Sequence, residues 1–354
     1  INAAPAGTHS SALVGIPGRP PRPGSWPAGC TFAARCAAAT DACRAELPPL
    51  VDLDGERRVR CIHPIAEPRV APTRTPIARP EEAVGSSIVV NGLRASYGKT
   101  TVLHDVSLEA RAGRCTAIVG ESGSGKTTLA QCLVGLNQRW SGEALLDEVP
   151  LAPAARRRTL DQRRRLQYIF QNPYGSLNPR QSVAENLEEA LAHFEPRLDA
   201  GARRDRIDKV LEQVALSAEY ADRMPDQLSG GERQRVAIGR ALIVDPTVLV
   251  CDEVTSALDV SVQALIVEQL RELQRSTGLT MLFITHNLGV VQSIAQDVIV
   301  LRRGRVVEQG RVVDVLSTPQ HPYTQQLLRD LPVMEAAASG PVDASGPSPV
   351  LPTF

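Results

Sequence analysis

The chain has 354 residues, of which 43% are hydrophobic and 3% aromatic, so it is long enough for one large or two ordinary domains. Its 39 Lys and Arg residues balance 39 Asp and Glu residues, which excludes a global basic field for holding nucleic acid or an anionic membrane surface. No apolar run approaches the roughly 20 residues of a membrane-spanning helix, and the start resembles no signal peptide, so we expect a cytosolic chain.

Two further features of the sequence are local. The chain opens with Ile1 rather than Met, as a fragment of a longer protein would. Arginines cluster at Arg156–Arg158, Arg163–Arg165 and Arg203–Arg206. Because each cluster is local, we expect all three to lie on solvated helix faces.

Composition divides the chain into four stretches. Residues 1–68 are rich in Pro, Ala and Gly, carry four of the seven cysteines, and have too few periodic apolar positions to form a core alone. Residues 69–85 are predicted to be an extended linker. Residues 86–335 have the pattern of a folded domain, and the Pro/Gly/Ser-rich residues 336–354 are predicted to be disordered.

Within residues 86–335, apolar strands alternate with helices, which predicts an α/β fold with a mainly parallel sheet. Strands are predicted at Cys115–Val119, Leu166–Phe170, Thr247–Cys251, Met281–Ile284 and Val298–Leu301, and helices at Lys126–Leu136, Gly231–Val244 and Val260–Ser276. A strongly charged helical stretch at about Gln181–Arg223 interrupts the alternation. We interpret it as an inserted helical subdomain.

A phosphate-binding loop is predicted after the first of these strands. Residues 120–127 have the sequence GESGSGKT, which matches the pattern Gly-x-x-x-x-Gly-Lys-Ser/Thr. Its glycines let successive backbone N–H groups turn toward phosphate oxygens, and the following helix adds the positive end of its dipole. Lys126 can reach the β- and γ-phosphates, and the Thr127 hydroxyl can bind Mg²⁺. The predicted ATP-binding residues here are Gly120, Glu121, Ser122, Gly123, Ser124, Gly125, Lys126, Thr127 and Thr128.

Two adjacent acids follow a buried strand further along the chain. Residues 248–253 have the sequence VLVCDE, four apolar residues and then Asp252 and Glu253. Asp252 is placed to hold Mg²⁺ through water, and Glu253 can orient and deprotonate the attacking water. The position of this pair downstream of the phosphate loop supports both assignments.

Residues 228–234, LSGGERQ, resemble the signature motif of ABC-type ATPases, which separates them from other phosphate-loop NTPases. The family's other motifs are present in order, namely the adenine-stacking aromatic at Tyr97, the Q-loop at Gln171, the D-loop at Ser256–Asp259 and the switch histidine at His286. The resemblance spans about residues 87–331. It implies a RecA-like mixed sheet core with an antiparallel β subdomain and a helical subdomain at about residues 172–235, all preceded by a small Cys-rich segment.

The resemblance also implies how these residues work. Two such domains would sandwich two ATP molecules head to tail, with residues of one domain reaching the ATP held by the other. These residues are Ser229, Gly230, Gly231, Gln234 and Asp259. Gln171 would contact Mg²⁺ and the water, and His286 would hold the γ-phosphate. One departure is Val254, where the family usually has Pro, and we expect hydrolysis to be retained.

Two further stretches narrow the resemblance to the dipeptide, oligopeptide and nickel importer ATPases. Residues 171–180, QNPYGSLNPR, resemble the extended Q-loop of that subfamily, and residues 321–324, HPYT, resemble its C-terminal hallmark. These similarities imply two permease subunits, an extracytoplasmic binding protein, and a peripheral position on the cytoplasmic face of the bacterial plasma membrane. Relatives also handle nickel chelates and haem, so the cargo stays open.

Residues 1–68 resemble the tail that follows the HPYT element in this same subfamily, although here they precede the ATPase domain. We interpret the chain as the end of one ATPase half, a linker and a complete second half. The expected partner is therefore a preceding ATPase domain on the same polypeptide.

Four cysteines in this segment, Cys30, Cys36, Cys43 and Cys61, could hold an iron–sulfur cluster or a structural Zn²⁺, or could remain free thiols. They lack the closely spaced Cys-x-x-Cys pairs of zinc ribbons, which disfavours zinc. The resemblance favours a 4Fe–4S cluster, because related importer ATPases carry one on such a tail. The other cysteines, Cys115, Cys132 and Cys251, lie in apolar patterns and are expected in the core.

Two functions of other kinds compete with a transport ATPase. Soluble ABC ATPases that act on DNA or ribosomes carry coiled-coil or zinc insertions, whereas the stretch between Gln171 and Ser229 has no heptads and no Cys. A non-hydrolysing regulatory half is disfavoured by the intact Glu253, His286 and signature motif. We therefore expect ATP and Mg²⁺ as ligands and no nucleic acid partner.

Overall fold

The computed structural model describes residues 26–52, 58–64, 86–172, 175–256 and 260–330. The predicted linker and the predicted C-terminal tail lie outside these ranges. In the N-terminal part, the described residues form short elements only, a 3₁₀ turn at Ala33–Arg35, helix α1 (Asp41–Ala45), and the antiparallel pair of β1 (Leu50–Asp52) with β2 (Arg58–Arg60).

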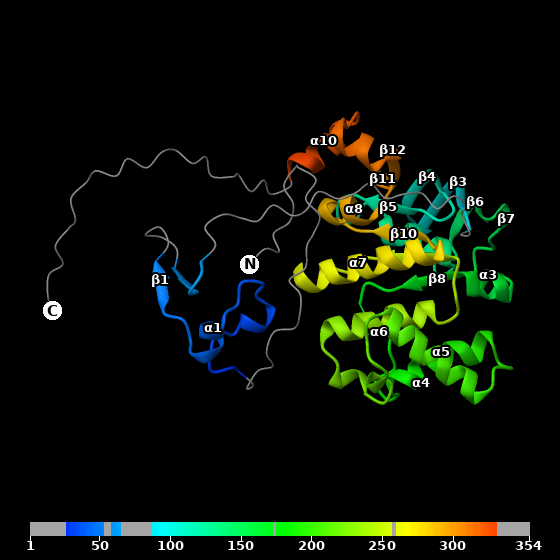
Figure 1. Cartoon of the computed structure of the whole chain (residues 1–354). Helices are drawn as coiled ribbons and strands as arrows, with labels where there is room; N and C mark the ends of the chain where they lie inside the picture. The colour runs from blue at the N-terminus through cyan, green and yellow to red at the C-terminus, as the bar shows by residue number, and fades with distance from the viewer. Residues whose placement is uncertain (1–25, 53–57, 65–85, 173–174, 257–259, 331–354) are drawn as a thin grey trace, which may run out of the picture.

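An antiparallel sheet of four strands opens the main domain. Its order is β4-β3-β6-β7, with bounds β3 Ile88–Tyr97, β4 Thr100–Ala110, β6 Trp140–Leu146 and β7 Val149–Pro150. Along β3 and β4, buried side chains alternate with exposed ones, as expected for a sheet with one face on the core. The sheet corresponds to the antiparallel β subdomain implied by the sequence resemblance (Figure 1).

A six-stranded sheet forms the centre of the domain, in the order β12-β11-β5-β10-β9-β8. Its strands are β5 Cys115–Val119, β8 Leu166–Ile169, β9 Val248–Asp252, β10 Thr280–Ile284, β11 Asp297–Arg302 and β12 Arg305–Arg311. All neighbours pair in parallel except β11 and β12, which form an antiparallel pair. The sheet is therefore mixed, with five parallel strands and an antiparallel edge.

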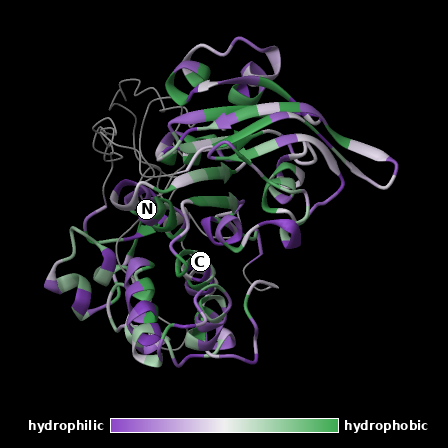
Figure 2. Ribbon diagram, turned by 90° about the vertical axis from the view of Figure 1, so that its right-hand side faces the viewer, coloured by the Kyte–Doolittle hydropathy of each residue, from purple (hydrophilic) through white to green (hydrophobic). Residues whose placement is uncertain are grey.

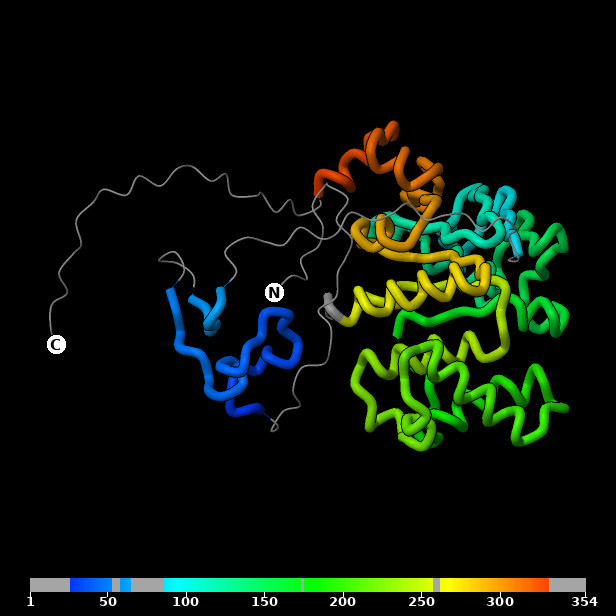
Figure 3. The backbone as a smooth tube through the Cα atoms, in the orientation of Figure 1, coloured from blue at the N-terminus to red at the C-terminus, as the bar shows by residue number. Residues whose placement is uncertain are grey.

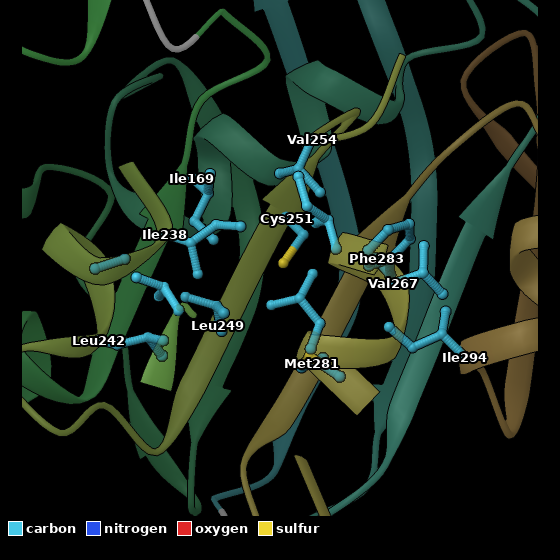
Figure 4. Close-up of a cluster of buried hydrophobic side chains, with 14 of the residues drawn as sticks. Ile169, Ile238, Leu242, Leu249, Cys251, Val254, Val267, Met281, Phe283 and Ile294 are labelled. Atoms are coloured by element: carbon cyan, nitrogen blue, oxygen red, sulfur yellow. The ribbon is translucent and has the colours of Figure 1, made fainter. Parts of the chain in front are cut away.

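Two hydrophobic clusters cover the two faces of this sheet, because successive side chains of a strand point to opposite sides. Leu249, Cys251 and Phe283 belong to one cluster, which Figure 4 shows packed between strands and helices. Val250 and Ile284 belong to the other, which includes residues of the antiparallel sheet. Strands β5, β9 and β10 are buried at every residue, and Figure 2 shows green, hydrophobic strands inside the domain. Cys115, Cys132 and Cys251 are buried as predicted.

The remaining helices frame the sheet or form a separate lobe. Those of the sheet-bearing part are α2 Lys126–Val134, α3 Leu160–Arg165, α7 Val260–Thr277, α8 Leu288–Ile294, α9 Val312–Ser317 and α10 Pro322–Arg329. The lobe consists of α4 (Val183–Phe194), α5 (Ala200–Gln213) and α6 (Gly230–Leu242), which pack on one another below the sheet in Figure 3. Within the described ranges, no helix has the length and apolar character needed to cross a membrane.

The predicted α/β class of an ABC-type phosphate-loop ATPase is confirmed. Both ends of each of the five predicted strands lie within one residue of the ends of the corresponding observed strand. Both ends of the three predicted helices lie within two residues of the ends of α2, α6 and α7. Helices α4 and α5 lie within the stretch at about Gln181–Arg223 that we interpret as a helical insertion, and α6 continues the lobe beyond it. Its helices begin at good N-caps, since Ser182 and Glu185 form a capping box at α4 and Asp199 caps α5.

The expectation for the arginine clusters is wrong for Arg158. Its guanidinium is 5% exposed and donates hydrogen bonds to the backbone oxygens of Cys132 and Leu133, at the carboxyl end of α2, and of Ala152. A cation at this end of a helix satisfies its last carbonyls and opposes the helix dipole. Burial lowers the pKa of Arg158 to about 10, so it remains charged at neutral pH.

Candidate functional site: a nucleotide site at the carboxyl edge of the sheet

The phosphate loop connects β5 to α2, as predicted. Gly120, Gly123 and Gly125 all have positive φ angles, which side-chain-bearing residues rarely adopt. Two of these glycines also have no room for a side chain: a Cβ at Gly120 would lie 2.1 Å from the Leu301 oxygen, and one at Gly125 would lie 2.6 Å from Leu103 Cδ2. The loop is thus fixed by close packing as well as by its own turns.

Lys126 lies in this loop with its ammonium group turned inward. The residue is 5% exposed, and Nζ donates to the backbone oxygens of Gly120 and Glu121 at 2.9 and 2.8 Å. Burial lowers the pKa of Lys126, while the negative charges of Glu253 and Asp252 oppose this shift. A cation held by the backbone oxygens of a glycine-rich loop is suited to receive a phosphate.

The neighbouring polar side chains of the loop complete its lining. Ser124 and Thr128 are buried, whereas Glu121, Ser122 and Gly123 are exposed. The Ser124 hydroxyl has no hydrogen-bond partner among the described residues, so a buried polar group here is available to a ligand.

Asp252 ends β9 beside the loop, 1% exposed. Its two carboxylate oxygens accept hydrogen bonds from the Thr127 hydroxyl at 3.2 Å and the Tyr168 hydroxyl at 2.6 Å. Burial raises the pKa of Asp252, although these two hydrogen bonds oppose the rise. Thr127, Asp252 and the nearby Gln171 offer oxygen ligands of the kind that Mg²⁺ prefers, so this donor set fits a magnesium ion.

The Glu253 carboxylate contacts the other two predicted catalytic residues, Gln171 and His286. Gln171 Nε2 donates to one of its carboxylate oxygens at 2.8 Å, and His286 Nδ1 lies 3.4 Å from the other. The backbone of Glu253 has φ +48°, a left-handed conformation that is uncommon for a side-chain-bearing residue and typical of functional positions. Its side chain is 18% exposed, so it faces a space that a water molecule can enter.

Val254, which replaces the family's proline, packs into the core next to this strained residue. It is 2% exposed and lies in the hydrophobic cluster of Figure 4. The substitution therefore leaves the peptide after Glu253 anchored by apolar contacts.

Tyr97 lies at the end of β3 with half of its surface exposed. Its hydroxyl donates to Gln131 Oε1 at 2.8 Å, which holds the ring over α2, the helix that follows the phosphate loop. An exposed aromatic face beside a phosphate site is suited to stack on a nucleotide base.

The signature residues stand at the start of α6, in the helical lobe. Ser229 and Glu232 form a capping box, in which each side chain accepts a hydrogen bond from the other's backbone N–H. Gly231 has no room for a side chain, because a Cβ there would lie 2.7 Å from Val262 Cγ1. Gly230 has open space around it, and Gln234 is buried with an unpartnered Nε2 among the described residues. The remaining predicted signature-side residue, Asp259, lies outside the described residues.

The predicted four-cysteine metal site is not assembled. Among the described residues, no three His, Cys, Asp or Glu side chains lie close enough to hold a metal ion. Cys30 and Cys43 are neighbours through a backbone hydrogen bond, but Cys43 is buried and its sulfur contacts the Thr40 hydroxyl at 3.4 Å. In the described residues, the four cysteines are therefore not gathered as ligands of one metal site.

Comparisons with known proteins agree with this geometry. The family described as "ABC transporter" matches residues 103–256. A putative peptide import ATP-binding protein of Brucella ovis is 44% identical over 247 residues, which cover 69% of this chain and 78% of the relative. A dipeptide transport ATP-binding protein of Haemophilus influenzae is 41% identical over 244 residues, 69% of this chain and 74% of the relative. The chain belongs to the ATP-binding proteins of ABC transporters. It is therefore an ATPase.

Solved structures place the same fold around the site of this ABC ATPase. One neighbour is cbiO1 from Clostridium perfringens, part of an ABC transporter complex, with a TM-score of 0.59 and 29% identity over 65% of this chain and 90% of the neighbour. Another is an ATP-binding cassette solved as a dimer bound to ADP and Pi, with a TM-score of 0.57 and 28% identity over 64% of this chain and 98% of the neighbour.

A second family match has an unusual distribution. The family described as "Oligopeptide/dipeptide transporter, C-terminal region" matches residues 307–350, which include the end of the ATPase domain, and also residues 1–43, before that domain. The same type of segment is therefore present at both ends of the chain.

Sequence reasoning missed Tyr168, the second partner of Asp252 in this ABC ATPase. Its signal was present, because a tyrosine within the apolar strand β8 needs a hydrogen-bond partner for its hydroxyl when buried. Only the parallel pairing of β8 with β9 identifies that partner as Asp252.

Replacing Tyr168 by Phe removes a donor that opposes the burial effect on Asp252. The pKa of Asp252 then rises further, so its carboxylate is protonated at a higher pH, and the acid limb of the pH–rate profile moves upward. We also expect the affinity for Mg²⁺ to fall about 10-fold or more, the usual effect of losing a hydrogen bond to a metal-site ligand. ATPase assays against pH and Mg²⁺ concentration measure both quantities.

The matched control is Thr116→Val, which removes a buried hydroxyl from the same sheet without touching the site. An unchanged acid limb and Mg²⁺ affinity in Tyr168→Phe would contradict the role given to this tyrosine.

Proposed function

We propose that this ATPase powers the import of di- and oligopeptides across the bacterial plasma membrane, from its cytoplasmic face. The observation that carries the proposal is the match of both chain ends to the oligopeptide/dipeptide transporter C-terminal region. The names of the relatives support it, including a di/tripeptide transport ATP-binding protein of Pseudomonas aeruginosa that is 40% identical over 269 residues, 75% of this chain and 82% of the relative. None of these names refers to nickel or haem.

The hydrolytic step follows from the arrangement around Glu253. A water molecule attacks the γ-phosphorus, its oxygen forms the new P–O bond, and the bond to the β,γ-bridging oxygen breaks to release ADP and phosphate. Glu253 accepts the water proton, while Gln171 and His286 hold its carboxylate in place. Thr127, Gln171 and Asp252 would hold Mg²⁺, which would neutralise negative charge at the phosphates. Lys126 contacts the β- and γ-phosphates.

A second ATPase domain completes each site. The start of α6 offers the backbone N–H groups of Gly230 and Gly231, the Ser229 side chain and a positive helix end, which suit a γ-phosphate held by another copy of the fold. In the proposal, Gln234 and Asp259 belong to the same trans surface. One neighbour of this fold has been solved as a dimer bound to ADP and Pi, which supports this arrangement.

The permease is proposed to dock between the sheet and the helical lobe. A groove here lies next to Gln171 and is bounded by β8, α4 and α6. Its lining includes the aromatic residues Tyr168, Phe170 and Phe194 and the polar residues Glu189, His193 and Arg240. Phe170 is 46% exposed, which is unusual for so large an apolar side chain. A short amphipathic helix of a permease subunit would cover it, and the cargo-binding protein would act on the other side of the membrane.

Catalysis by Glu253 is tested by Glu253→Gln, which keeps the size of the side chain and removes its basicity. We expect ATP binding to be retained and the rate of hydrolysis to fall about 100-fold or more, the usual contribution of a general base. The control is Glu272→Gln, on the exposed face of α7. Near-normal turnover of Glu253→Gln would refute the assignment of the base.

Peptide import is tested in the host bacterium. A strain that lacks this gene and requires one amino acid should fail to grow when that amino acid is supplied only within a peptide, and should grow on the free amino acid. Wild-type protein should restore growth, and Lys126→Ala should not. Normal growth on peptides, combined with loss of nickel or haem uptake, would contradict the proposed cargo and leave the ATPase assignment intact.

We further propose that the preferred second ATPase domain precedes this one on the same polypeptide. Residues 1–43 match the same family region as residues 307–350 at the C-terminal end of the ATPase domain, which supports this arrangement. An immunoblot of the host should therefore detect a product far larger than the 38.1 kDa of this chain. A native product of 38 kDa would contradict the tandem arrangement.

A further inference from the structure

The HPYT element begins the last described helix, and three of its residues have separable structural tasks. His321 is the N-cap of α10, with its Nδ1 accepting a hydrogen bond from the backbone N–H of Tyr323. Pro322 occupies the first helical position, where its missing N–H costs nothing. The Glu308 carboxylate accepts hydrogen bonds from the backbone N–H groups of Gln320 and His321, which anchors the start of the helix to β12.

Tyr323 extends from this anchored helix to the phosphate loop. It is 1% exposed, and its hydroxyl oxygen accepts a hydrogen bond of 2.9 Å from the backbone N–H of Glu121. The Arg302 guanidinium lies 4.6 Å from the centre of the tyrosine ring and packs it from β11. Burial raises the pKa of Tyr323, so the phenol is neutral at physiological pH. Burial, the contact with Arg302 and the hydrogen bond from Glu121 together hold the Tyr323 side chain in place.

The peptide groups of Glu121 are held from two directions. Tyr323 accepts from its N–H, and Lys126 donates to its C=O at 2.8 Å. A phosphate that binds in the loop competes for the Lys126 ammonium. When Lys126 turns to that phosphate and leaves the Glu121 oxygen, the hydrogen bond from the Glu121 N–H to the Tyr323 hydroxyl still holds Glu121 in place.

The same C-terminal part of the domain contacts the loop at two further points. The Gly304 N–H, in the turn between β11 and β12, donates to the backbone carbonyl oxygen of Ser124 at 2.8 Å. The Leu301 oxygen lies so close to Gly120 that no side chain fits between them. The outer side of the phosphate loop thus rests on residues 301–323.

We propose that Tyr323 is a positioning residue for ATP binding, which holds the phosphate loop in its binding conformation through the Glu121 N–H. The loop then needs less ordering when ATP arrives, and affinity rises because less conformational entropy is lost. This role belongs to the ATP site itself and does not depend on the cargo. It gives the HPYT element a function in the nucleotide site, in addition to its value as a hallmark of a transporter subfamily.

The test is Tyr323→Phe in the full chain, which removes the hydroxyl and keeps the ring, its burial and its packing against Arg302. We expect Mg·ATP to bind about 2- to 10-fold more weakly, the effect of losing one hydrogen bond, with little change in thermal stability. Hydrogen–deuterium exchange of the peptide containing residues 120–127 should become faster in the absence of nucleotide. Equilibrium binding of a fluorescent ATP analogue and differential scanning fluorimetry give the other two readouts.

The matched control is Thr318→Val, which removes a hydroxyl that, within the described residues, donates only to the Asp314 oxygen at the end of α9, in the same C-terminal part of the domain. It should leave both ATP affinity and exchange at residues 120–127 unchanged. If Tyr323→Phe lowers thermal stability but leaves affinity and exchange at wild-type values, Tyr323 is structural only and the proposal is wrong. If Tyr323→Phe does not fold, Arg302→Gln, which removes only the packing cation, should weaken ATP binding, and unchanged binding would overturn the proposal.

Discussion

The parallel pairing of β5, β8, β9 and β10 is the constraint on which the rest of this protein depends. Parallel strands end at the same edge of a sheet, so the loops that leave them meet there even when they are far apart in the sequence. These four strand ends bring together Lys126, Gln171, Asp252, Glu253 and His286. The antiparallel sheet and the helical lobe add Tyr97 and the groove beside Phe170 around this edge.

Charged side chains buried at this edge need hydrogen-bond partners to stay charged. Burial raises the pKa of Asp252 and lowers that of Lys126, so each charged form is maintained by hydrogen bonds from its surroundings. Tyr168 and Thr127 donate hydrogen bonds to Asp252, and Gln171 donates one to Glu253. Lys126 donates to backbone oxygens of the phosphate loop. Nucleotide phosphates and Mg²⁺ can replace several of these bonds, which makes the site rigid yet able to exchange partners.

Much of this site could be predicted from the sequence, because apolar runs predict the central strands and the ABC motifs predict the residues at their ends. The contributions of Tyr168, Tyr323 and Arg158 could not, since their partners lie on segments far away in the chain and become neighbours only in the folded sheet. The cysteines show a second limit of prediction from the sequence, which is that residue types do not determine their positions in space. Cys30, Cys36, Cys43 and Cys61 have the ligand chemistry for a cluster, yet suitable residue types do not by themselves bring four sulfurs to one point.

The central claim is that the strand ends form one hydrolytic site with Glu253 as its base. A crystal structure of the full chain with Mg²⁺ and a non-hydrolysable ATP analogue tests this claim most directly. We expect the γ-phosphate beside Lys126, Mg²⁺ bound at Thr127, and a water molecule between the Glu253 carboxylate and the γ-phosphorus. A nucleotide bound in this loop with Glu253 turned away from the γ-phosphate, and with no water between them, would contradict it.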